Sequence, residues 1–369
     1  RYIPDRFLPD KAIDVIDEAG AMVRLYHSDN TLVDEKIIEQ TVAKIARIPS
    51  QEVSSSEIDR LKNLERDLKS VIFGQDEAIE TVVRVIKLAK TGLKEPSRPI
   101  GCFLFTGPTG VGKTELARQL AQKLGISFLR FDMSEYMEKH SVAKLIGAPP
   151  GYIGFEQGGL LTEQIRKNPH CVLLLDEIEK AHEEIFNILL QVMDYGTLTD
   201  NTGRKADLRN VILIMTSNIG AREMEKPAVG FGDRTSEQIK KTKEAVEKWF
   251  SPEFRNRLDA TVTFNHLPEE IVMRIVDKFI KELNEQLASK NILVKITEKA
   301  RQWLGRKGFD PKFGARPLQR IIQKEIKAQL VEEILFGRLI QGGVVTVDIS
   351  RDGLNFIFSD LCSDALHLK

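Results

Sequence analysis

The chain has 369 residues, which is enough for more than one packed unit with its own core. Its 54 basic and 54 acidic residues cancel, so the overall charge does not attract nucleic acid or an anionic membrane surface, although a local basic stripe is not excluded. Cys102, Cys171 and Cys362 are too widely spaced for a zinc or disulfide framework, and we expect thiols in a reducing compartment. The first residue is Arg1 rather than an initiator methionine, and the first residues do not resemble a signal peptide. No apolar run is long enough to span a membrane. We therefore expect a fragment of a cytoplasmic, bacterial-type protein.

Amphipathic spacing predicts helices in the first part of the chain. Apolar side chains recur at helical intervals near the start, where Pro9 or Asp10 would begin a helix, and again over residues 36–47. A Ser-rich stretch then reads as a linker before another helix. We expect a helical piece over residues 1–50, followed by a linker and one helix over residues 51–70.

The middle of the chain alternates short apolar runs with helical segments. The runs are Cys102–Thr106, Phe128–Phe131, Cys171–Leu175 and Val211–Thr216. Unbroken apolar strands between helices are typical of a parallel sheet covered on both faces, so we predict an α/β core over residues 71–265. Residues 266–350 are expected to form a small, mostly helical domain, and a final pair of strands is expected near residues 343–358. Residues 351–369 are a tail to which we assign no role.

A glycine-rich loop provides the strongest indication of chemistry. Residues Gly107–Thr114 match the pattern GxxxxGK[ST] between a predicted strand and a predicted helix. Glycines let backbone N–H groups close around phosphate oxygens, and the helix N-terminus adds partial positive charge. Lys113 would contact the β and γ phosphates, and the Thr114 hydroxyl would face Mg²⁺. The residues expected to contact the nucleotide are Gly107, Pro108, Thr109, Gly110, Val111, Gly112, Lys113 and Thr114. A chance glycine-rich turn is the alternative, which the strand and helix on either side disfavour.

Polar side chains follow two further predicted strands. Asp176 and Glu177 come directly after the run Cys171–Leu175, and Asn218 follows the run that ends near Thr216. Ligands of α/β proteins bind at the carboxyl edge of the sheet. Asp176 would hold Mg²⁺, partly through water, and Glu177 would act as general base on the attacking water. Asn218 would orient that water or touch the γ-phosphate. The alternatives are helix caps for the two acids and a turn residue for Asn218.

Several sequence strings occur together and in a fixed order. They are Gly74–Ala78, Gly107–Thr114, Phe131–Tyr136, Gly147–Gly154, Leu175–His182, Phe254–Asp259 and Gly314–Pro317. In this combination the chain resembles the AAA+ unfoldases of the Clp/Hsp100 family, and in particular the second ATPase module of its ClpA-type members. The resemblance covers nearly the whole chain. It implies a P-loop AAA+ core with a small helical subdomain, and ATP or ADP with Mg²⁺ as cofactors.

The resemblance also implies roles for residues outside the phosphate loop. Arg257 matches the arginine finger that reaches the nucleotide of a neighbouring subunit, with Arg255 as a rival. Arg316 matches the residue that senses the γ-phosphate from the small domain. Val71 and Ile72 match the segment that holds adenine by backbone and apolar contact. The alternatives are a surface arginine paired to a nearby acid, an arginine at a helix N-terminus, and a plain core strand.

Two further loops are implied to bind other proteins. Tyr152 and Ile153 match the loop that lines the axial pore of a hexamer and grips an extended polypeptide. Val229, Gly230 and Phe231 match the tripeptide that docks on a ClpP-type peptidase ring, although ClpA-type members typically carry Ile-Gly-Leu there. The alternatives are a tyrosine folded back on its own domain and a chance tripeptide.

The start of the chain also fits the family. Asp5–Gly20 resembles the end of a preceding ATPase module, and the absence of a long coiled-coil middle domain favours the ClpA type over ClpB and ClpC. The resemblance implies a homo-hexameric unfoldase that threads unfolded or tagged proteins into a ClpP-type peptidase. Adaptor proteins would bind through an N-terminal domain outside this chain, and the polar stretch 199–205 would form a second pore loop. The alternatives are a disaggregase without a peptidase and a nucleic-acid motor of the same superfamily, and we expect neither nucleic acid nor membrane as a partner.

Overall fold

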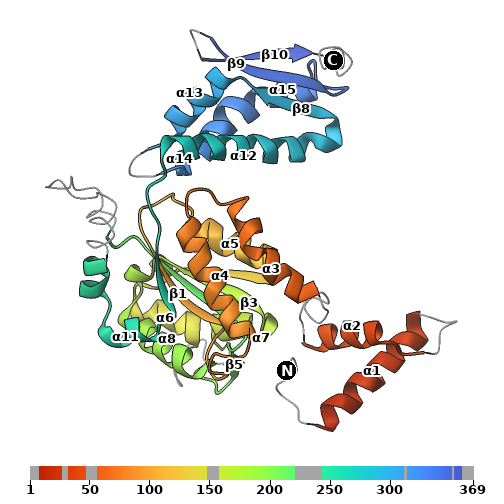
Figure 1. Cartoon of the computed structure of the whole chain (residues 1–369), viewed down its shortest axis with the longest axis vertical. Helices are drawn as coiled ribbons and strands as arrows, with labels where there is room; N and C mark the ends of the chain where they lie inside the picture. The colour runs from red at the N-terminus through yellow and green to blue at the C-terminus, as the bar shows by residue number, and fades with distance from the viewer. Residues whose placement is uncertain are drawn as a thin grey trace. The chain divides into compact units, whose positions relative to one another are not determined.

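The computed structural model describes residues 8–26, 32–46, 56–147, 158–220, 243–310, 314–350 and 353–359. Contacts divide the chain into two units, whose helices and strands are labelled in Figure 1. Unit 1 comprises residues 1–70, 77–106 and 113–263, and unit 2 comprises residues 71–76, 107–112 and 264–369. Unit 1 thus contains most of the expected α/β core. Unit 2 combines the expected small domain with two short segments from earlier in the chain.

Unit 1 is built on a five-stranded sheet in the order β2-β3-β6-β1-β7, in which all neighbours are parallel. The strands are β1 (Gly101–Thr106), β2 (Ser127–Asp132), β3 (Cys171–Asp176), β6 (Ile212–Ser217) and β7 (Ala260–Thr263). β1, β3 and β6 are buried at every residue, as expected for the central strands of a parallel sheet. The predicted α/β fold is therefore confirmed.

The strand β2 differs from the expectation of burial on both faces. Phe131 is its only fully buried residue, and Arg130 is exposed. The reason is its position, because β2 pairs only with β3 and forms one edge of the sheet. The apolar run in the sequence does not reveal which strand lies at the edge.

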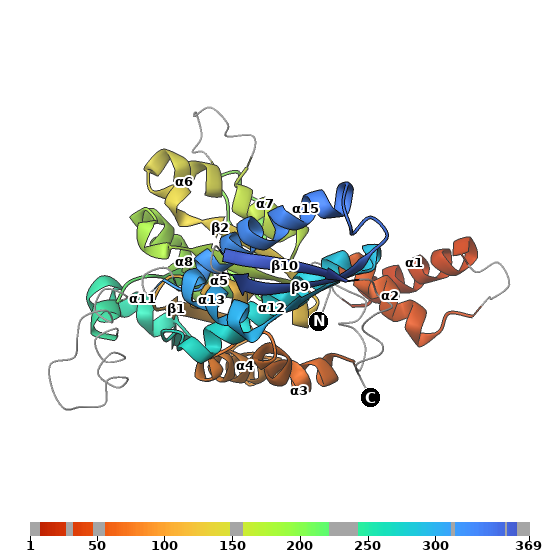
Figure 2. The same ribbon diagram turned by 90° about the horizontal axis from the view of Figure 1, so that it is seen from above.

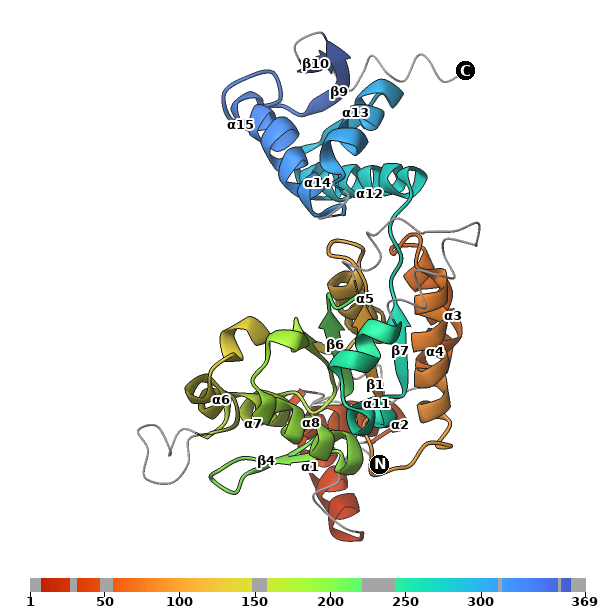
Figure 3. The same ribbon diagram turned by 90° about the vertical axis from the view of Figure 1, so that its left-hand side faces the viewer.

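Helices cover both faces of this sheet. On one side lie α3 (Ser56–Lys69) and α4 (Asp76–Lys90), and α5 (Lys113–Leu124) packs between α3 and the strands β2 and β3. The other side carries α6 (Lys139–Ile146), α7 (Leu160–Lys167) and α8 (Glu183–Tyr195). Figures 2 and 3 show α3 and α4 on the opposite side of the sheet from α6, α7 and α8. The side chains of β1 alternate between the two faces of the sheet. Leu104 packs in the same hydrophobic cluster as Leu189 of α8, while Phe103 and Phe105 are buried on the other side.

Short elements complete unit 1. They are the 3₁₀ turns η2 (Met133–Tyr136) and η4 (Ile178–Lys180), the antiparallel hairpin β4 (Thr197–Thr199) and β5 (Lys205–Asp207), and the helix α11 (Pro252–Arg257). Near the start of the chain, α1 (Asp10–Tyr26) and α2 (Glu35–Ala46) pack against each other. Ala19, Val23 and Ala43 are buried there, which confirms the expected pair of amphipathic helices.

Unit 2 contains a bundle of helices against a three-stranded sheet in the order β10-β9-β8. Its elements are α12 (Glu269–Leu287), η5 (Ala288–Lys290), β8 (Ile292–Ile296), α13 (Glu298–Gly308), α14 (Arg316–Ile321), the π-helical η6 (Ile322–Lys327), α15 (Ala328–Leu335), β9 (Gly343–Ser350) and β10 (Gly353–Ser359). The expected strand pair is present, but β10 lies beyond residue 350, so the sheet continues into the expected tail. In the described part of the chain, no helix is both long and apolar enough to cross a membrane.

Candidate active site

The phosphate loop connects β1 to α5 and needs glycine for two different reasons. Gly107 has φ +133°, and a Cβ there would lie 2.3 Å from the backbone oxygen of Phe264. Gly112 has φ +110°, but a Cβ there would meet nothing within 4 Å. The first glycine permits close packing of backbone, and the second permits a backbone conformation that other residues rarely adopt, at a place where a Cβ would meet open space. This arrangement fits a bound phosphate chain.

Gln75 holds the phosphate loop in place through its side-chain amide. Its side chain is buried, and its amide nitrogen donates to the backbone oxygens of Val111 (3.3 Å) and Asn265 (2.9 Å). The backbone N–H of Asn265 donates to the Gln75 side-chain oxygen at 3.2 Å. Since both ends of the amide are used, Gln75 ties the loop to the segment that leads into α12.

Lys113 is the first residue of α5 and is almost fully buried. Its Nζ donates to the Asn218 side-chain oxygen at 2.9 Å. Burial lowers the pKa of Lys113 to about 8, although the carboxylates of Glu179, Asp176 and Glu177 act in the opposite direction. A buried ammonium group at a helix N-terminus is suited to an anionic ligand, because the negative charge of that ligand would balance a positive charge that water does not reach.

Asp176 ends β3 and is held by side chains from three other elements. The Thr114 hydroxyl lies 3.5 Å from Oδ2, and the Arg130 guanidinium lies 2.7 Å from the same oxygen. The Thr216 hydroxyl donates to Oδ1. Among the described residues, no group of three or more His, Cys, Asp or Glu side chains could hold a metal ion. The Thr114 and Asp176 oxygens, 3.5 Å apart, fit a Mg²⁺ ion that takes its other ligands from phosphate oxygens and water.

Glu177 follows Asp176 in a left-handed backbone conformation, with φ 58° and ψ 50°. Its backbone N–H donates to the Thr216 hydroxyl at 3.0 Å, and its carboxylate pairs with Lys180. A non-glycine residue in this region is strained, and such strain is common where a side chain must take a set direction. Thr216 thus orients Asp176 through its donor and Glu177 through its acceptor.

Asn218 is fixed at both its side chain and its backbone. The side-chain oxygen accepts from Lys113, and the backbone N–H donates to Glu179 Oε1 at 3.0 Å. The second oxygen of Glu179 is buried and has no hydrogen-bond partner within the described residues. The structure therefore brings Lys113, Thr114, Asp176, Glu177 and Asn218 together at the carboxyl edge of the sheet.

In unit 2 the sequence string around Arg316 touches the phosphate loop by backbone. The N–H of Ala315 donates to the Gly110 oxygen at 3.2 Å. Gly314 has φ +58°, and a Cβ there would lie 2.7 Å from the Gly110 oxygen and 2.8 Å from that of Thr109. Arg316 is exposed at the start of α14.

Val71 and Ile72 lie in a turn, so the alternative of a plain core strand does not apply to them. Ile72 is buried, and the Val71 backbone oxygen accepts from Lys278 Nζ at 3.1 Å. An adenine held there would meet backbone and apolar groups, which is the chemistry expected for this segment.

Arg257 is engaged within its own unit. Its Nε donates to Asp194 Oδ2 at 2.7 Å, and its guanidinium also pairs with Glu253 at 3.1 Å. Its rival Arg255 pairs with Glu247 at 3.5 Å. Within one chain, Arg257 is thus an arginine paired with nearby acids, which is the alternative considered above. The ion pair with Asp194 sets the direction of its side chain. Tyr152, Ile153, Val229, Gly230 and Phe231 lie outside the described residues.

Comparison with known proteins identifies the family. The family described as AAA domain (Cdc48 subfamily) matches residues 98–261, the C-terminal, D2-small domain of ClpB protein matches residues 267–347, and an AAA lid domain matches residues 1–69. A ClpA homolog protein of Fuscovulum blasticum is 58% identical over 358 residues, which are 96% of this chain and 45% of that protein. The chain belongs to the Clp/Hsp100 family of AAA+ ATPases.

Other Clp/Hsp100 proteins match over the same extent. ClpC of Staphylococcus saprophyticus is 40% identical over 424 residues, and ClpB of Oceanobacillus iheyensis is 41% identical over 421 residues, each covering 96% of this chain and 52% of the relative. A cryo-EM structure of Hsp104 in a closed state with ATPγS and FITC casein has a TM-score of 0.80 and 36% identity, covering 97% of this chain and 62% of that one. The chain spans about half the length of the curated relatives that it matches. The AAA+ fold implies nucleotide binding.

Three side chains of this site were not predicted from the sequence. Arg130 contacts Asp176, Thr216 connects Asp176 to Glu177, and Glu179 binds the backbone of Asn218. Arg130 and Thr216 each stand out as a polar residue in an otherwise apolar strand, and that signal was available. Glu179 carries no comparable signal, because acids are common in the first turn of a helix.

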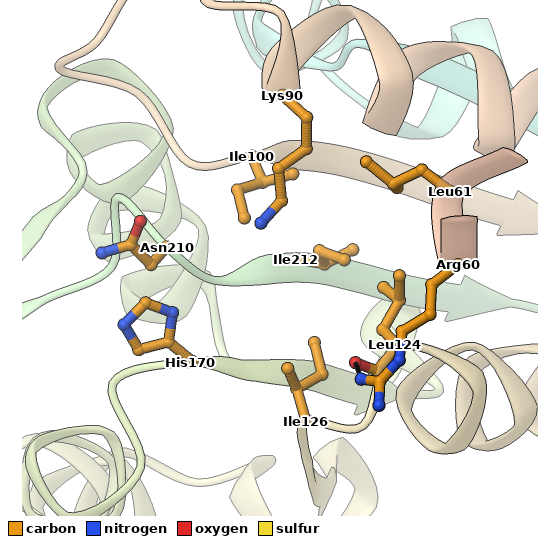
Figure 4. Close-up of a pocket in the computed structure, with 9 residues that line it drawn as sticks. All are labelled: Arg60, Leu61, Lys90, Ile100, Leu124, Ile126, His170, Asn210 and Ile212. Atoms are coloured by element: carbon orange, nitrogen blue, oxygen red, sulfur yellow. Dashed lines mark hydrogen bonds between the residues drawn. The ribbon is translucent and has the colours of Figure 1, made fainter. Parts of the chain in front are cut away.

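One cavity lies away from this site, at the amino ends of the strands (Figure 4). It is lined by Arg60, Leu61, Lys90, Ile100, Leu124, Ile126, His170, Asn210 and Ile212. Its volume is about 20 Å³, which is room for about one water molecule. Arg60 of α3 donates to the Leu124 backbone oxygen at 3.1 Å, at the end of α5. A cavity of this size does not compete with the phosphate loop as a ligand site.

Proposed function

We propose that this module is the ATP-driven motor of a protein unfoldase and translocase, working as a homo-hexameric ring that feeds a ClpP-type peptidase. The observation that carries the proposal is the convergence of Lys113, Asp176, Glu177 and Asn218 at one edge of the sheet. The similarity to Clp ATP-binding subunits and to Hsp104 with casein supports the choice of a polypeptide as substrate. A cytoplasmic location is part of the same proposal.

Each residue of the site has a separate role in hydrolysis. Bound ATP supplies the phosphoryl group, and its Mg²⁺ neutralises phosphate charge. Lys113 and the loop N–H groups would bind the phosphates, while Thr114 and Asp176 would hold the ion. The Glu177 carboxylate takes a proton from the attacking water, which Asn218 orients.

Other residues complete the site and report its state. Arg257 of a neighbouring subunit would stabilise charge on the transferred phosphoryl group. Val71 and Ile72 would hold adenine. Arg316 would sense the γ-phosphate, and the Gly314 backbone contact with the phosphate loop supports that assignment. We propose AAA+ subdomain limits of residues 71–265 and 266–350, with the second sheet extending to residue 359.

Mechanical work would be delivered by Tyr152 and Ile153, which grip an extended chain in the axial pore. Val229, Gly230 and Phe231 would dock on the peptidase ring, and adaptors would bind through a further domain. These assignments rest on the family resemblance.

The test is degradation of a tagged, folded fluorescent protein by the full-length protein that carries this chain, together with a ClpP-type peptidase. Tyr152→Ala and a deletion of residues 229–231 should both hydrolyse ATP but fail to degrade the substrate. Glu177→Gln should stop hydrolysis and degradation together. If Glu177→Gln degraded folded substrate at the full rate, the proposed motor would lose its basis.

The same experiment tests the alternative of a disaggregase. ClpB of Oceanobacillus iheyensis is a chaperone protein, and its 41% identity is close to that of the ClpC relative. If the deletion of residues 229–231 degraded the substrate normally, the peptidase partnership would be wrong and the disaggregase would be preferred. A nucleic-acid motor would instead show filter binding that weakens steeply with added salt.

A further inference from the structure

The two flanks of segment 148–157 lie side by side. Gly147 follows the end of α6, and Gly159 precedes the start of α7. A Cβ at Gly159 would lie 2.6 Å from the backbone carbon of Ile146, and a Cβ at Gly147 would lie 3.4 Å from the Gly159 nitrogen. The chain therefore enters and leaves this segment, which contains Tyr152, at one place.

Asn201, in the turn between β4 and β5, binds the first flank. Its backbone N–H donates to the Ile146 oxygen at 3.3 Å, and its side-chain amide donates to the Gly147 oxygen. The Asn201 side chain is exposed, so it contributes little to the core. Its two hydrogen bonds instead satisfy the last carbonyl groups of α6, which have no partner inside the helix.

Asp200, next to Asn201, binds the second flank. Its Oδ2 accepts from the Gly159 backbone N–H at 3.4 Å and from the Thr162 hydroxyl at 3.2 Å. Its Oδ1 accepts from the backbone N–H groups of Thr202 (3.0 Å) and Arg204 (2.8 Å). Burial alone would raise the pKa of Asp200, but these hydrogen bonds hold it below its ordinary value. The carboxylate is therefore ionised and links the hairpin turn to the start of α7.

We propose that Asp200 and Asn201 are positioning residues that fasten both flanks of segment 148–157 to the β4–β5 hairpin, so that a displacement of the hairpin moves both flanks. This inference rests on the proposed function, because the position of Tyr152 matters only if the chain grips a polypeptide. It adds that the hairpin and both flanks move together, and it names the residues that join them.

The hairpin is also connected to the catalytic carboxylates. Glu177 leads through η4 into α8, and Gly196 in a left-handed conformation turns the chain from α8 into β4. The backbone N–H of Leu208, just after β5, returns to the Gly196 oxygen at 2.7 Å. A displacement at Glu177 thus has a packed route through one helix to the hairpin, and through Asp200 and Asn201 to both flanks.

The first measurement is the ATP consumed per folded substrate molecule degraded, in the full-length protein with a ClpP-type peptidase. Asn201→Ala should raise this ratio about fivefold. When the flank is held less firmly, the hairpin moves during some ATPase cycles without moving the substrate. Asn63→Ala is the matched control, because the half-buried Asn63 also donates from its side-chain amide to a backbone oxygen, that of Asp59, at 3.0 Å. The control should keep the wild-type ratio.

The second measurement is hydrogen exchange, without substrate, at the backbone N–H of residue 201, which donates to the Ile146 oxygen. Asn201→Ala should speed exchange there about fivefold, relative to the intrinsic rate of the residue, and leave β1 and β6 unchanged. Asn201→Asp keeps the size of the side chain but lacks the side-chain donor, and it should show the same changes. It replaces the alanine variant if that variant folds poorly. A wild-type ratio or wild-type exchange in both variants would overturn the inference. Normal degradation by Tyr152→Ala would instead overturn the proposed function, while exchange still decides whether Asn201 holds the flank.

Discussion

The two ends of the same buried strands differ in what they offer a ligand. At the carboxyl ends, Asn218 accepts from Lys113 at 2.9 Å, and Asp176 accepts from three neighbouring side chains. At the amino ends, His170 and Asn210 line a cavity of about 20 Å³. Both ends therefore contain polar residues beside apolar strands, but at the carboxyl ends these residues come from several elements and bind one another.

The helix α5 explains much of the difference. Its N-terminus, with Lys113, faces the carboxyl edge, where a helix dipole favours an anion. Its last backbone oxygen, that of Leu124, is bound by the Arg60 guanidinium at the amino edge. A cavity lined by polar residues is thus not enough for an active site. The direction of α5 decides whether the nearby helix end favours a negative or a positive charge. Paired substitutions at the two edges test this comparison.

The largest effect is expected from Lys113→Ala. It should weaken ATP binding on the order of 100-fold, because a buried charge-assisted contact is lost. The ligand-free protein should melt no lower, since burial already disfavours the charged form of Lys113, whose pKa is about 8. Calorimetric titration with ATP and a thermal melt measure the two quantities. Lys90→Ala, at the amino-edge cavity, is the matched control and should bind ATP as the wild type does.

A smaller effect is expected from Thr216→Val, which keeps the shape but removes the hydroxyl. Asp176 and Glu177 would lose a shared partner, and the hydrolysis rate should fall about 10- to 100-fold with ATP affinity changed less than about threefold. Thr216→Ser should restore most of the rate. Steady-state hydrolysis and nucleotide titration separate the two effects, and an equal loss of rate in Thr216→Ser would contradict the role of the hydroxyl.

Gly314→Ala should act through the phosphate loop. The new Cβ would lie 2.7 Å from the Gly110 oxygen at a φ of +58°, so the backbone contact must open. We expect ATP affinity to fall about tenfold. Gly92→Ala is the control for backbone strain alone, because Gly92 has φ +78° but a Cβ there would meet nothing within 4 Å. Equal affinities in the two variants would mean that the contact with Gly110 does not matter.

The sequence predicted the parts of this site that are local in the chain. The loop Gly107–Thr114 and the pair Asp176 and Glu177 are contiguous strings, and each follows an apolar run whose burial is confirmed. The contacts of Arg130 and Thr216 were not predictable in the same way. They depend on β2 and β6 flanking β3, and strand order is a property of the folded sheet.

The flanks of segment 148–157 illustrate the same limit. Asp200 and Asn201 read as ordinary turn residues, and nothing in their neighbourhood in the sequence points to Gly147 or Gly159. Only packing of the hairpin against α6 and α7 gives them a second set of partners. Long-range positioning residues are therefore the part of the mechanism that requires a structure.

The smallest effect is expected at the amino edge, from Ile212→Val. Ile212 is 1% exposed, lines the cavity and begins β6, so removing one methylene should cost about 1 kcal/mol of unfolding free energy. ATP affinity and hydrolysis should not change, because the polar network lies at the far end of the strand. Ile214→Val, in the middle of β6, is the matched control and should cost a similar amount. Chemical denaturation measures the stability, and a nucleotide titration of Ile212→Val then decides the comparison. A loss of ATP affinity without a matching loss in Ile214→Val would mean that the amino edge communicates with the site through β6, and the two edges would no longer be independent.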